Sequence, residues 1–155
     1  MKLAAFSING KKTYGKINED FVVEAPSELL ARYNDISEAA NINGLKHLFD
    51  CWDSKNQYDL RDIKYLLPIA RPNKIICVGV NYPDRNAEYK DGSSSPQNPS
   101  LFIRFPSTFT AHLNPLIRPP ESDQLDYEGE IAIIIGTPGR RISIEAAFDH
   151  IAAFT

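Results

Sequence analysis

The clearest strand pattern in this chain of 155 residues is the sequence LDYEGEIAIII at residues 125–135. Because side chains on a strand point alternately to its two faces, the odd-numbered positions gather apolar side chains on one face. The even-numbered positions place Asp126, Glu128 and Glu130 on the opposite face, with the Cα atoms of the two glutamates about 6.5–7 Å apart. The segment therefore predicts a strand with one face in the core and one acidic face.

The acidic face of this strand is consistent with a cation site. Two carboxylates so close together repel each other unless a positive charge lies between them. Mg²⁺, Mn²⁺ or Ca²⁺ would supply that charge, because these hard cations prefer oxygen ligands, and Gly129 would let a ligand approach closely. Taken alone, a Glu-x-Glu pattern more often belongs to a solvent-exposed face whose glutamates pair with lysines, so Glu128 and Glu130 by themselves are only a weak indication of a metal site.

Further elements are predicted on either side of this strand. The sequence KIICVGV at residues 74–80 is apolar and β-branched, as in a core strand covered on both faces. Shorter strands are predicted at residues 101–105 and 115–118. After the main strand, Ser143 can cap a helix with apolar residues at helical spacing as far as Ile151. This part of the chain is therefore expected to be rich in strands.

The first 70 residues predict a small module of their own. Strands are expected at residues 2–8, 11–16 and 21–24. Between the first two, the Asn9-Gly10 dipeptide favours a type I′ turn. Ser37 is expected to cap a helix with a buried stripe that runs from Leu45 to Trp52 at i, i+3, i+4 and i+7 spacing.

A domain boundary is predicted after this module. Pro68 and Pro72 force the residues between them to run extended. We therefore expect residues 1–72 to form a small N-terminal lead-in domain and residues 73–155 to belong to a second domain.

Composition and charge exclude several classes of partner. The formal net charge is -3, and the basic residues are scattered rather than gathered in a stripe, so no nucleic-acid partner is expected. No apolar run approaches the ~20 residues that span a bilayer, so no membrane partner is expected either. The two cysteines show neither metal-ligand spacing nor a secreted disulfide pattern, which favours a cytoplasmic protein.

Several pieces of the sequence, taken jointly, resemble the fumarylacetoacetate hydrolase family. They are CVGVNY at residues 77–82 with Glu88 after it, PSLFIR at 99–104, DYEGEIA at 126–132, Ile135-Gly136 and the helix predicted from Ser143. The order and approximate spacing are those of the family, and the N-terminal strands resemble the lead-in domain of many members. The resemblance implies an α+β, β-rich fold with a mixed sheet that is incomplete in this chain.

The resemblance also implies a metal centre. In the family, the two glutamates of the Glu-x-Glu strand, here Glu128 and Glu130, hold Mg²⁺ or a similar ion, with Mn²⁺ and Ca²⁺ as alternatives. A third, aspartate ligand follows in an Asn-Asp-x-Ser-x-Arg-Asp type segment. The sequence stops at Thr155, before such a segment, so we expect the catalytic domain to be truncated here. Relatives also imply a homodimer.

The acid/base group departs from the family pattern. Many relatives carry a His–Glu dyad after the first core strand, whereas this chain has Arg85 and Glu88 at those positions. Arginine cannot act as a base at neutral pH. Either Glu88 acts alone, or Arg85 binds a substrate carboxylate through two hydrogen bonds, or the two residues form only a helix-surface pair.

Other residues are candidates for binding a small anionic substrate. Arg104 lies where relatives often carry a lysine near the site, and Tyr82 and Ser107 are weaker candidates.

The function implied is that of a metal-dependent enzyme acting on a 2-oxo acid or 1,3-dicarbonyl compound. The first reaction expected is hydrolysis of a C–C bond. Decarboxylation or isomerisation of the same substrates is also possible, because all three reactions can proceed from the same enolate. The rival hypothesis is a non-catalytic fragment or dimerisation module that keeps the fold without turnover.

Overall fold

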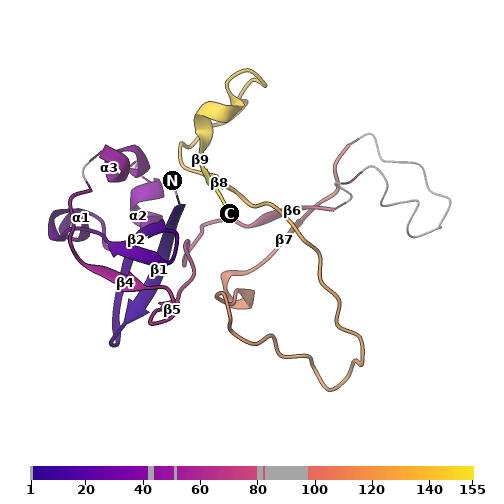
Figure 1. Cartoon of the computed structure of the whole chain (residues 1–155). Helices are drawn as coiled ribbons and strands as arrows, with labels where there is room; N and C mark the ends of the chain where they lie inside the picture. Colours follow the sequence, from indigo (N-terminus) through magenta and orange to yellow (C-terminus); the bar gives the residue numbers. More distant parts are fainter. Residues whose placement is uncertain (1, 42–43, 51, 80–81, 83–97) are drawn as a thin grey trace. The chain divides into compact units, whose positions relative to one another are not determined.

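The computed structural model describes residues 2–41, 44–50, 52–79, 82 and 98–155, and it has the mixed α+β, strand-rich architecture predicted (Figure 1). The chain separates into two compact units. One unit combines Met1–Ala70 with Thr110–Thr155, and the other is Arg71–Phe109. Among the helices in the described ranges, none has the length and apolar character needed to cross a membrane.

The first unit is organised around a five-stranded antiparallel sheet in the order β4-β3-β2-β1-β5. Its strands are β1 (Lys2–Ile8), β2 (Lys11–Asn18), β3 (Phe21–Glu24), β4 (Gln57–Asp59) and β5 (Lys64–Tyr65). At the first hairpin Ile8 pairs with Lys11, and Asn9 and Gly10 have φ values of 50° and 79°. Two positive φ values are what a type I′ turn requires, so the predicted hairpin is confirmed.

At Gly15, the backbone of β2 lies unusually close to atoms of β3. A Cβ atom added to Gly15 would lie 2.6 Å from Val22 Cγ2 and 2.6 Å from the carbonyl oxygen of Val23. Gly15 pairs with Glu24 in the register of the two strands. Glycine is therefore required at this position by the close approach of the neighbouring strand.

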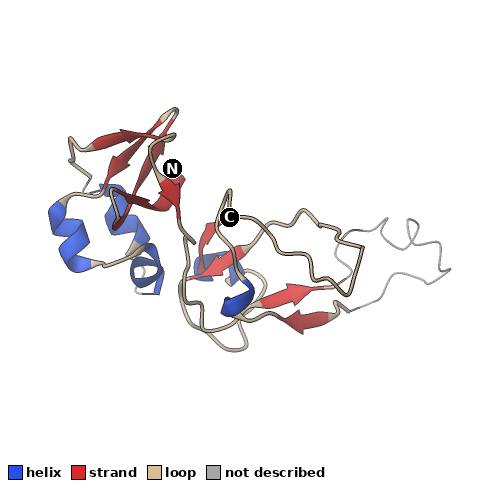
Figure 2. Cartoon of the chain, turned by 90° about the horizontal axis from the view of Figure 1, so that it is seen from below, coloured by secondary structure: helices blue, strands red, loops and turns tan. Residues whose placement is uncertain are grey.

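Three short helices lie against one side of this sheet (Figure 2). They are α1 (Ser27–Arg32), α2 (Ile36–Asn41) and α3 (Leu45–Asp50). Their apolar side chains surround Tyr14, which is 1% exposed, and Leu48, which is fully buried, belongs to the same core. Burial against the sheet holds these helices in place, because helices of six residues are not stable alone.

The helix predicted from Ser37 is wrong in its start and its continuity. The backbone N–H of Glu38 donates to Asp35 Oδ1 at 2.9 Å, so Asp35 performs the capping role. Ser37 lies inside α2, and its Oγ accepts a hydrogen bond from the N–H of Ala70 at 3.3 Å. The segment forms two helices rather than one, and Trp52 lies beyond the second.

Two buried polar groups are fixed by hydrogen bonds in the first unit. Glu24 is 3% exposed and accepts hydrogen bonds from Lys11 Nζ at 3.1 Å, Tyr58 Oη at 3.1 Å and Asn56 Nδ2 at 3.3 Å. Burial by itself would raise the pKa of Glu24. The hydrogen bond and positive charge of Lys11, together with the hydrogen bond from Tyr58, have a larger opposite effect, so the pKa is lowered. This carboxylate is therefore held ionised.

The hydroxyl of Tyr14 is the second such group. It donates to the carbonyl oxygens of Leu29 at 3.1 Å and Tyr33 at 3.2 Å, tying β2 to the end of α1. Burial, followed by the nearby Tyr33, Asp35 and Glu38, raises the pKa of Tyr14 to about 12. The neutral hydroxyl is thus the form that the fold accommodates.

Two shorter antiparallel ribbons complete the strand inventory of the described residues. β6 (Ile76–Val78) pairs with β7 (Leu101–Ile103) in the second unit, and β8 (Ile133–Ile135) pairs with β9 (Ile151–Phe154) in the first. The prediction that residues 74–80 form a strand covered on both faces is wrong for this chain. Ile76 is 60% exposed, because β7 is the only strand beside β6 among the described residues, and a two-stranded ribbon has no second layer of its own.

The main predicted strand is also shorter than expected. Only Ile133–Ile135 of the segment 125–135 is strand, and Ala132 exchanges two backbone hydrogen bonds with Thr155 at its start. No strand of the described residues pairs with 125–132, so that stretch lacks a ladder to hold it. The predicted strand at 115–118 is absent from the structure for the same reason.

The core-facing side of β8 also differs from the prediction. Ile134, paired with Ala153, packs against the core of the first unit, whereas the odd-numbered Ile133 and Ile135 are 55% and 59% exposed. The faces assigned from alternation are therefore reversed at this strand.

The helix predicted from Ser143 is a turn followed by the 3-10 helix η2 (Ala147–His150). Ser143 Oγ accepts the N–H of Ala146 at 3.4 Å, a cap-like contact, but Phe148 is 77% exposed. His150 Nδ1 lies 2.9 Å from the carbonyl oxygen of Thr137, which ties η2 to the loop after β8. None of the described residues forms a layer that covers Phe148, so the predicted apolar stripe is not packed there.

Candidate substrate and metal residues

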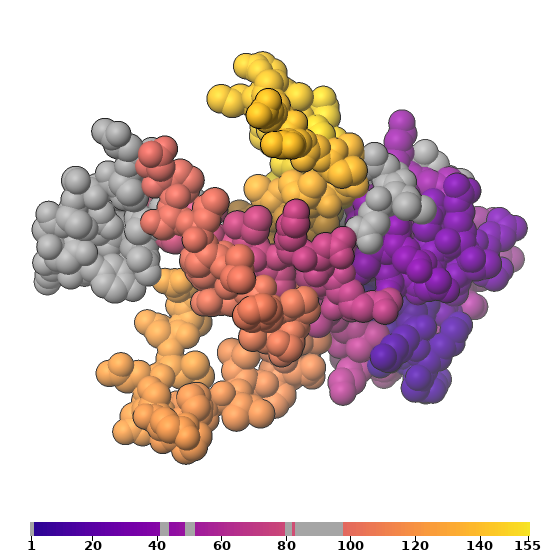
Figure 3. Space-filling model, turned by 180° about the vertical axis from the view of Figure 1, so that it is seen from behind, coloured from indigo at the N-terminus to yellow at the C-terminus, as the bar shows by residue number. Residues whose placement is uncertain are grey.

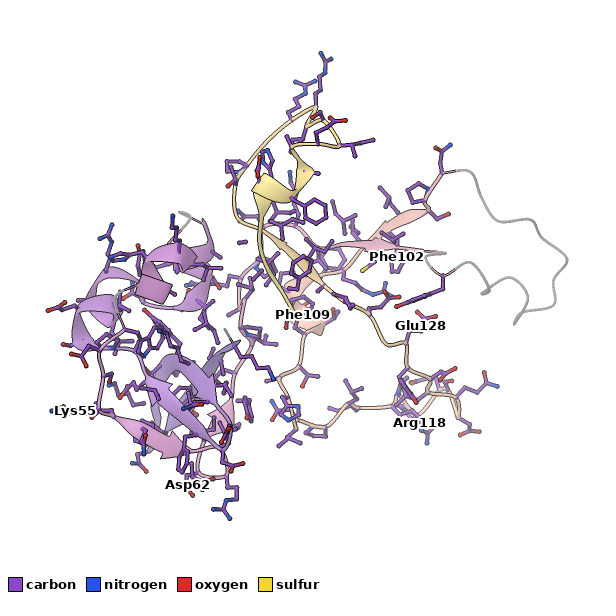
Figure 4. The ribbon with its side chains drawn as sticks, turned by 45° about the horizontal axis from the view of Figure 1, so that its top comes forward. Lys55, Asp62, Phe102, Phe109, Arg118 and Glu128 are labelled. Carbon is purple, nitrogen blue, oxygen red and sulfur yellow. The ribbon has the colours of Figure 1, made fainter. Side chains whose placement is uncertain are left out.

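The best-defined candidate site residue is Arg104, directly after β7. Its backbone N–H donates to the carbonyl oxygen of Ile75 at 3.3 Å, which continues the β6–β7 ladder by one step. The guanidinium carbon lies 4.7 Å from the centroid of the Phe102 ring, a cation–π arrangement. Figure 4 labels Phe102 on this ribbon. The charge is exposed at one end and supported by an aromatic face, which suits recognition of a carboxylate.

Phe102 supports the guanidinium of Arg104, and the sequence analysis did not identify it. Residues two apart on a strand share a face, so the sequence Phe102-Ile103-Arg104 already placed the ring and the guanidinium together. In the observed register Phe102 lies opposite Cys77, and this pair therefore shares the face of Arg104. The signal was present in the spacing.

The two weaker candidates lie in the same unit as Arg104. Ser107 is exposed within the 3-10 helix η1 (Pro106–Thr108), and the side chain of its neighbour Thr108 donates to the carbonyl oxygen of Phe105 at 2.8 Å. Tyr82 is 54% exposed. Glu88 and Arg85, the predicted catalytic pair, lie outside the residues that the structure describes.

Glu128 and Glu130 lie in the first unit, on the stretch that precedes β8. Both are exposed, and Figure 4 shows Glu128 on a part of the chain drawn without a strand arrow. The geometry expected from strand alternation is therefore not the observed one. Around Gly129 between them, an added Cβ would meet no atom within 4 Å. The position is open to approach, as the sequence suggested.

The donor chemistry of this pair fits a hard divalent cation, but its number of ligands does not complete a site. Such cations take about six or more oxygen ligands, part of them from water. Within the described ranges, no group of three or more His, Cys, Asp and Glu side chains could hold a metal ion. These residues thus offer two carboxylates and no third protein ligand.

A protein-family model matches the second half of the chain. The family model described as "Fumarylacetoacetate (FAA) hydrolase C-terminal" matches residues 74–155, a range that contains every candidate site residue named above.

Curated relatives agree with that match. The chain is 42% identical over 101 residues to the oxaloacetate tautomerase YisK of Bacillus subtilis, which is 63% of this chain and 33% of that protein. It is 35% identical over 94 residues to the human mitochondrial oxaloacetate tautomerase FAHD2A, covering 61% of this chain and 29% of that protein. The chain therefore spans about a third of the curated relatives that it matches.

Solved structures give the same answer for the fold. A fumarylacetoacetate hydrolase from psychrophilic Exiguobacterium antarcticum aligns with 99% of this chain and 53% of its own, with a TM-score of 0.73 and 26% identity. A protein from Mycobacterium abscessus aligns with a TM-score of 0.65 at 22% identity, which speaks for the fold alone. The family model covers more than half of the chain, and the strand-rich fold agrees with it. The chain belongs to the fumarylacetoacetate hydrolase family, a family of enzymes.

Proposed function

We propose that this chain carries part of the active site of an enzyme that interconverts the keto and enol forms of a 2-oxo acid, with oxaloacetate as the first substrate to test. The observation that carries the proposal is the 42% identity over 101 residues to a protein named oxaloacetate tautomerase. Vertebrate relatives with the same activity in their names support it at 35–38% identity.

Isomerisation is favoured over C–C bond hydrolysis by the acid/base residues. Keto–enol exchange breaks one C–H bond next to the carbonyl and forms one O–H bond, so it needs no activated water. A single carboxylate such as Glu88 can accept and return that proton. Arg85, which cannot act as a base, would bind a carboxylate of the substrate instead.

Arg104 would provide a second anchor for the anionic substrate. Its guanidinium lies against the Phe102 ring, so part of its orientation is fixed before any substrate binds. A dicarboxylate has two negative groups, and two arginines could hold one each. Tyr82 and Ser107 would add neutral hydrogen-bond donors.

Glu128 and Glu130 would hold a divalent cation, with Mg²⁺ as the first candidate and Mn²⁺ or Ca²⁺ as alternatives. When bound, such an ion polarises the carbonyl oxygen of a 2-oxo acid. The support is the oxygen chemistry of the pair and the open space at Gly129. We further propose a homodimer in the cytoplasm, on the grounds of family resemblance and cysteine usage.

The proposal can be tested in a chimera. The aligned 101 residues of the Bacillus subtilis tautomerase are replaced by those of this chain, and the ultraviolet absorbance of the enol of oxaloacetate is followed with Mg²⁺ present. We expect tautomerisation, and we expect Glu128→Gln and Glu130→Gln each to abolish its metal-dependent part. The matched control is Glu121→Gln, an exposed acid outside the motif, which should leave the rate unchanged.

The same chimera separates the reaction types. Glu88→Gln should lower the turnover by roughly 100-fold or more if Glu88 moves the proton, and Arg104→Met should mainly raise KM. Cleavage of an acylpyruvate at a rate above that of tautomerisation would instead favour the hydrolase reading. An unchanged rate in both glutamine variants would remove the metal assignment.

A further inference from the structure

The turn between β1 and β2 joins two residues whose groups can react with each other. It consists of Asn9 and Gly10, which are both exposed. Figure 3 shows the indigo N-terminal segment, which contains this hairpin, at the surface of the molecule. A Cβ atom added to Gly10 would meet no atom within 4 Å. In an Asn-Gly pair the glycine nitrogen can reach the side-chain amide carbon of the asparagine, because glycine has no side chain to obstruct it.

We propose that Asn9-Gly10 is a site of spontaneous deamidation. The backbone nitrogen of Gly10 attacks Cγ of Asn9, a C–N bond forms, and the side-chain nitrogen leaves as ammonia with the proton that Gly10 gives up. Water then adds to one of the two carbonyl carbons of the resulting succinimide ring and breaks its bond to the nitrogen. Opening at Cγ gives aspartate. Opening at the backbone carbon gives isoaspartate, in which the main chain runs through the former side chain.

The hairpin allows this ring to form without separating the strands. The closing hydrogen bond of a type I′ turn joins the flanking residues, here Ile8 and Lys11, so it does not hold the nitrogen of Gly10. Rotation of the peptide group between Asn9 and Gly10 converts a type I′ turn into a type II′ turn, which also fits a two-residue hairpin. The rotation brings the Gly10 nitrogen to the side of the Asn9 side chain, as the ring requires.

A second Asn-Gly pair, Asn43-Gly44, provides a comparison within the same chain. The N–H of Gly44 donates to the carbonyl oxygen of Ala39 at 2.6 Å, and an added Cβ would lie 2.8 Å from the ring of Tyr33. Asn43 itself lies outside the described residues. Attack by the Gly44 nitrogen has to break this hydrogen bond in crowded surroundings, so the fold favours reaction at Asn9.

Isoaspartate at position 9 would disturb a buried charge pair. It adds one main-chain atom between Ile8 and Lys11, the pair that begins the strand register, and a two-residue type I′ turn does not accommodate that atom. Lys11 Nζ lies 3.1 Å from Oε1 of Glu24, whose side chain is only 4% exposed. A displaced Lys11 leaves this carboxylate without its charged partner. Aspartate keeps the original main chain, so only the isoaspartate product should destabilise the first unit.

The test follows the full 155-residue chain during storage at mildly alkaline pH, which favours loss of the proton from the attacking nitrogen. Trypsin places the two Asn-Gly pairs on different peptides, residues 3–11 and 33–46, and fragment masses assign each amide-to-acid conversion to its position. We expect conversion at Asn9 to exceed that at Asn43 by about fivefold or more, since a hydrogen bond has to break first at Gly44. In concentrated urea, where the fold is absent, the two pairs should convert at equal rates.

The matched control is Asn9→Gly, because Gly-Gly also favours a type I′ turn and carries no side-chain amide. Storage should lower the urea midpoint of the wild type, followed by Trp52 fluorescence, and should leave that of Asn9→Gly unchanged. Fresh Asn9→Asp should stay close to fresh wild type, since Asp-Gly suits the same turn.

The isoaspartate fraction is identified by methylation with an isoaspartate methyltransferase, and in this fraction the pKa of Glu24 should rise. Equal conversion at Asn9 and Asn43 in the folded chain would overturn the proposal. An isoaspartate fraction with the urea midpoint of fresh wild type would also overturn it.

Discussion

The sheet of β1–β5 and the two ribbons β6–β7 and β8–β9 differ in what covers their side chains. Ala5 and Tyr14 in the sheet are 9% and 1% exposed, and the three helices that follow in sequence cover them within the same 70 residues. In the ribbons, Leu101 and Ile133 are 63% and 55% exposed. Strand pairing alone therefore does not create a core. The apolar face of the paired strands also has to be covered by a second layer of side chains.

A further difference is that the central hairpin of the sheet joins strands that are close along the chain. β1 meets β2 across a two-residue turn, whereas β6 meets β7 across more than twenty residues and β8 meets β9 across fifteen. Local contacts form with little loss of chain entropy, and distant ones need more burial to offset it. Four of the five predictions that follow compare one position in residues 1–70, here called the closed region, with a matched position in residues 71–155, here called the open region.

The largest expected effect is the loss of stability when a buried apolar side chain is shortened. Leu48→Ala should lower the free energy of unfolding by about 2–5 kcal/mol, because Leu48 is fully buried and its removal leaves a cavity. Leu116→Ala, at a position 67% exposed, should change it by less than about 0.5 kcal/mol. Urea titration followed by Trp52 fluorescence measures both, and equal losses would mean that the two regions are equally packed.

The buried carboxylate gives the next effect. Glu24→Gln should lower the free energy of unfolding by about 1.5–3 kcal/mol, since charge-assisted hydrogen bonds from Lys11 and Tyr58 are lost. The exposed Glu121→Gln should do nothing measurable.

The lowered pKa of Glu24 also predicts how the stability of the protein changes in acid. The pKa of Glu24 is lowered in the folded state from 4.5, so its contribution to stability is complete above that value and is lost as the pH falls through the lower folded pKa. Glu24→Gln should remove this part of the acid dependence. Parallel stability curves for wild type and variant between pH 7 and 3 would contradict the assignment.

Tyr14→Phe should cost about 0.5–1.5 kcal/mol, because the hydroxyl donates to carbonyl oxygens of α1 and its end. The pKa of Tyr14 rises from 10.0 to about 12 on folding, so the stability gained from the neutral form is present below pH 10 and is lost as the pH rises through about 12. Tyr127→Phe, at a residue 89% exposed, is the control and should leave the free energy of unfolding unchanged.

The smallest expected effects concern two exposed ion pairs, one in each region. Arg61 forms a two-pronged pair with Asp59 at 2.9 and 2.6 Å, and Arg118 reaches Asp123 at 3.2 Å. Alanine at either arginine should leave the melting temperature unchanged within error, because solvent screens such pairs. The side-chain and backbone hydrogen bonds from Arg61 lower the pKa of Asp59 to about 2. An NMR titration of Arg61→Ala should find the pKa raised only part of the way to its ordinary value, because the backbone N–H of residue 61 still donates to Asp59 Oδ1.

The sequence predicted the closed region better than the open one, for a physical reason. The Asn9-Gly10 turn and the strands around it depend on neighbouring residues, and they were correct. The cap was assigned to Ser37 instead of Asp35, since both residue types cap helices and only the observed contact of Asp35 with Glu38 decides between them.

In the open region the apolar alternation at 125–135 was read correctly as a pattern and wrongly as a continuous strand. A strand exists only where a partner supplies its hydrogen bonds, and among the described residues β9 reaches only the last part of that segment. The Phe102–Arg104 contact needed only the two-residue spacing and could have been predicted. The positions of Glu128 and Glu130 depend on contacts far along the chain, so alternation alone could not give them.

The open surroundings of Gly129 make it a suitable attachment point for a spectroscopic label. A cysteine there would carry a spin label or fluorophore between the two glutamates, with no atom within 4 Å of the new Cβ to be displaced. The same substitution at Gly15 would push β2 away from β3. A spin label at 129 would thus test directly whether Mn²⁺ binds at the neighbouring Glu128 and Glu130, through paramagnetic broadening that falls steeply with distance.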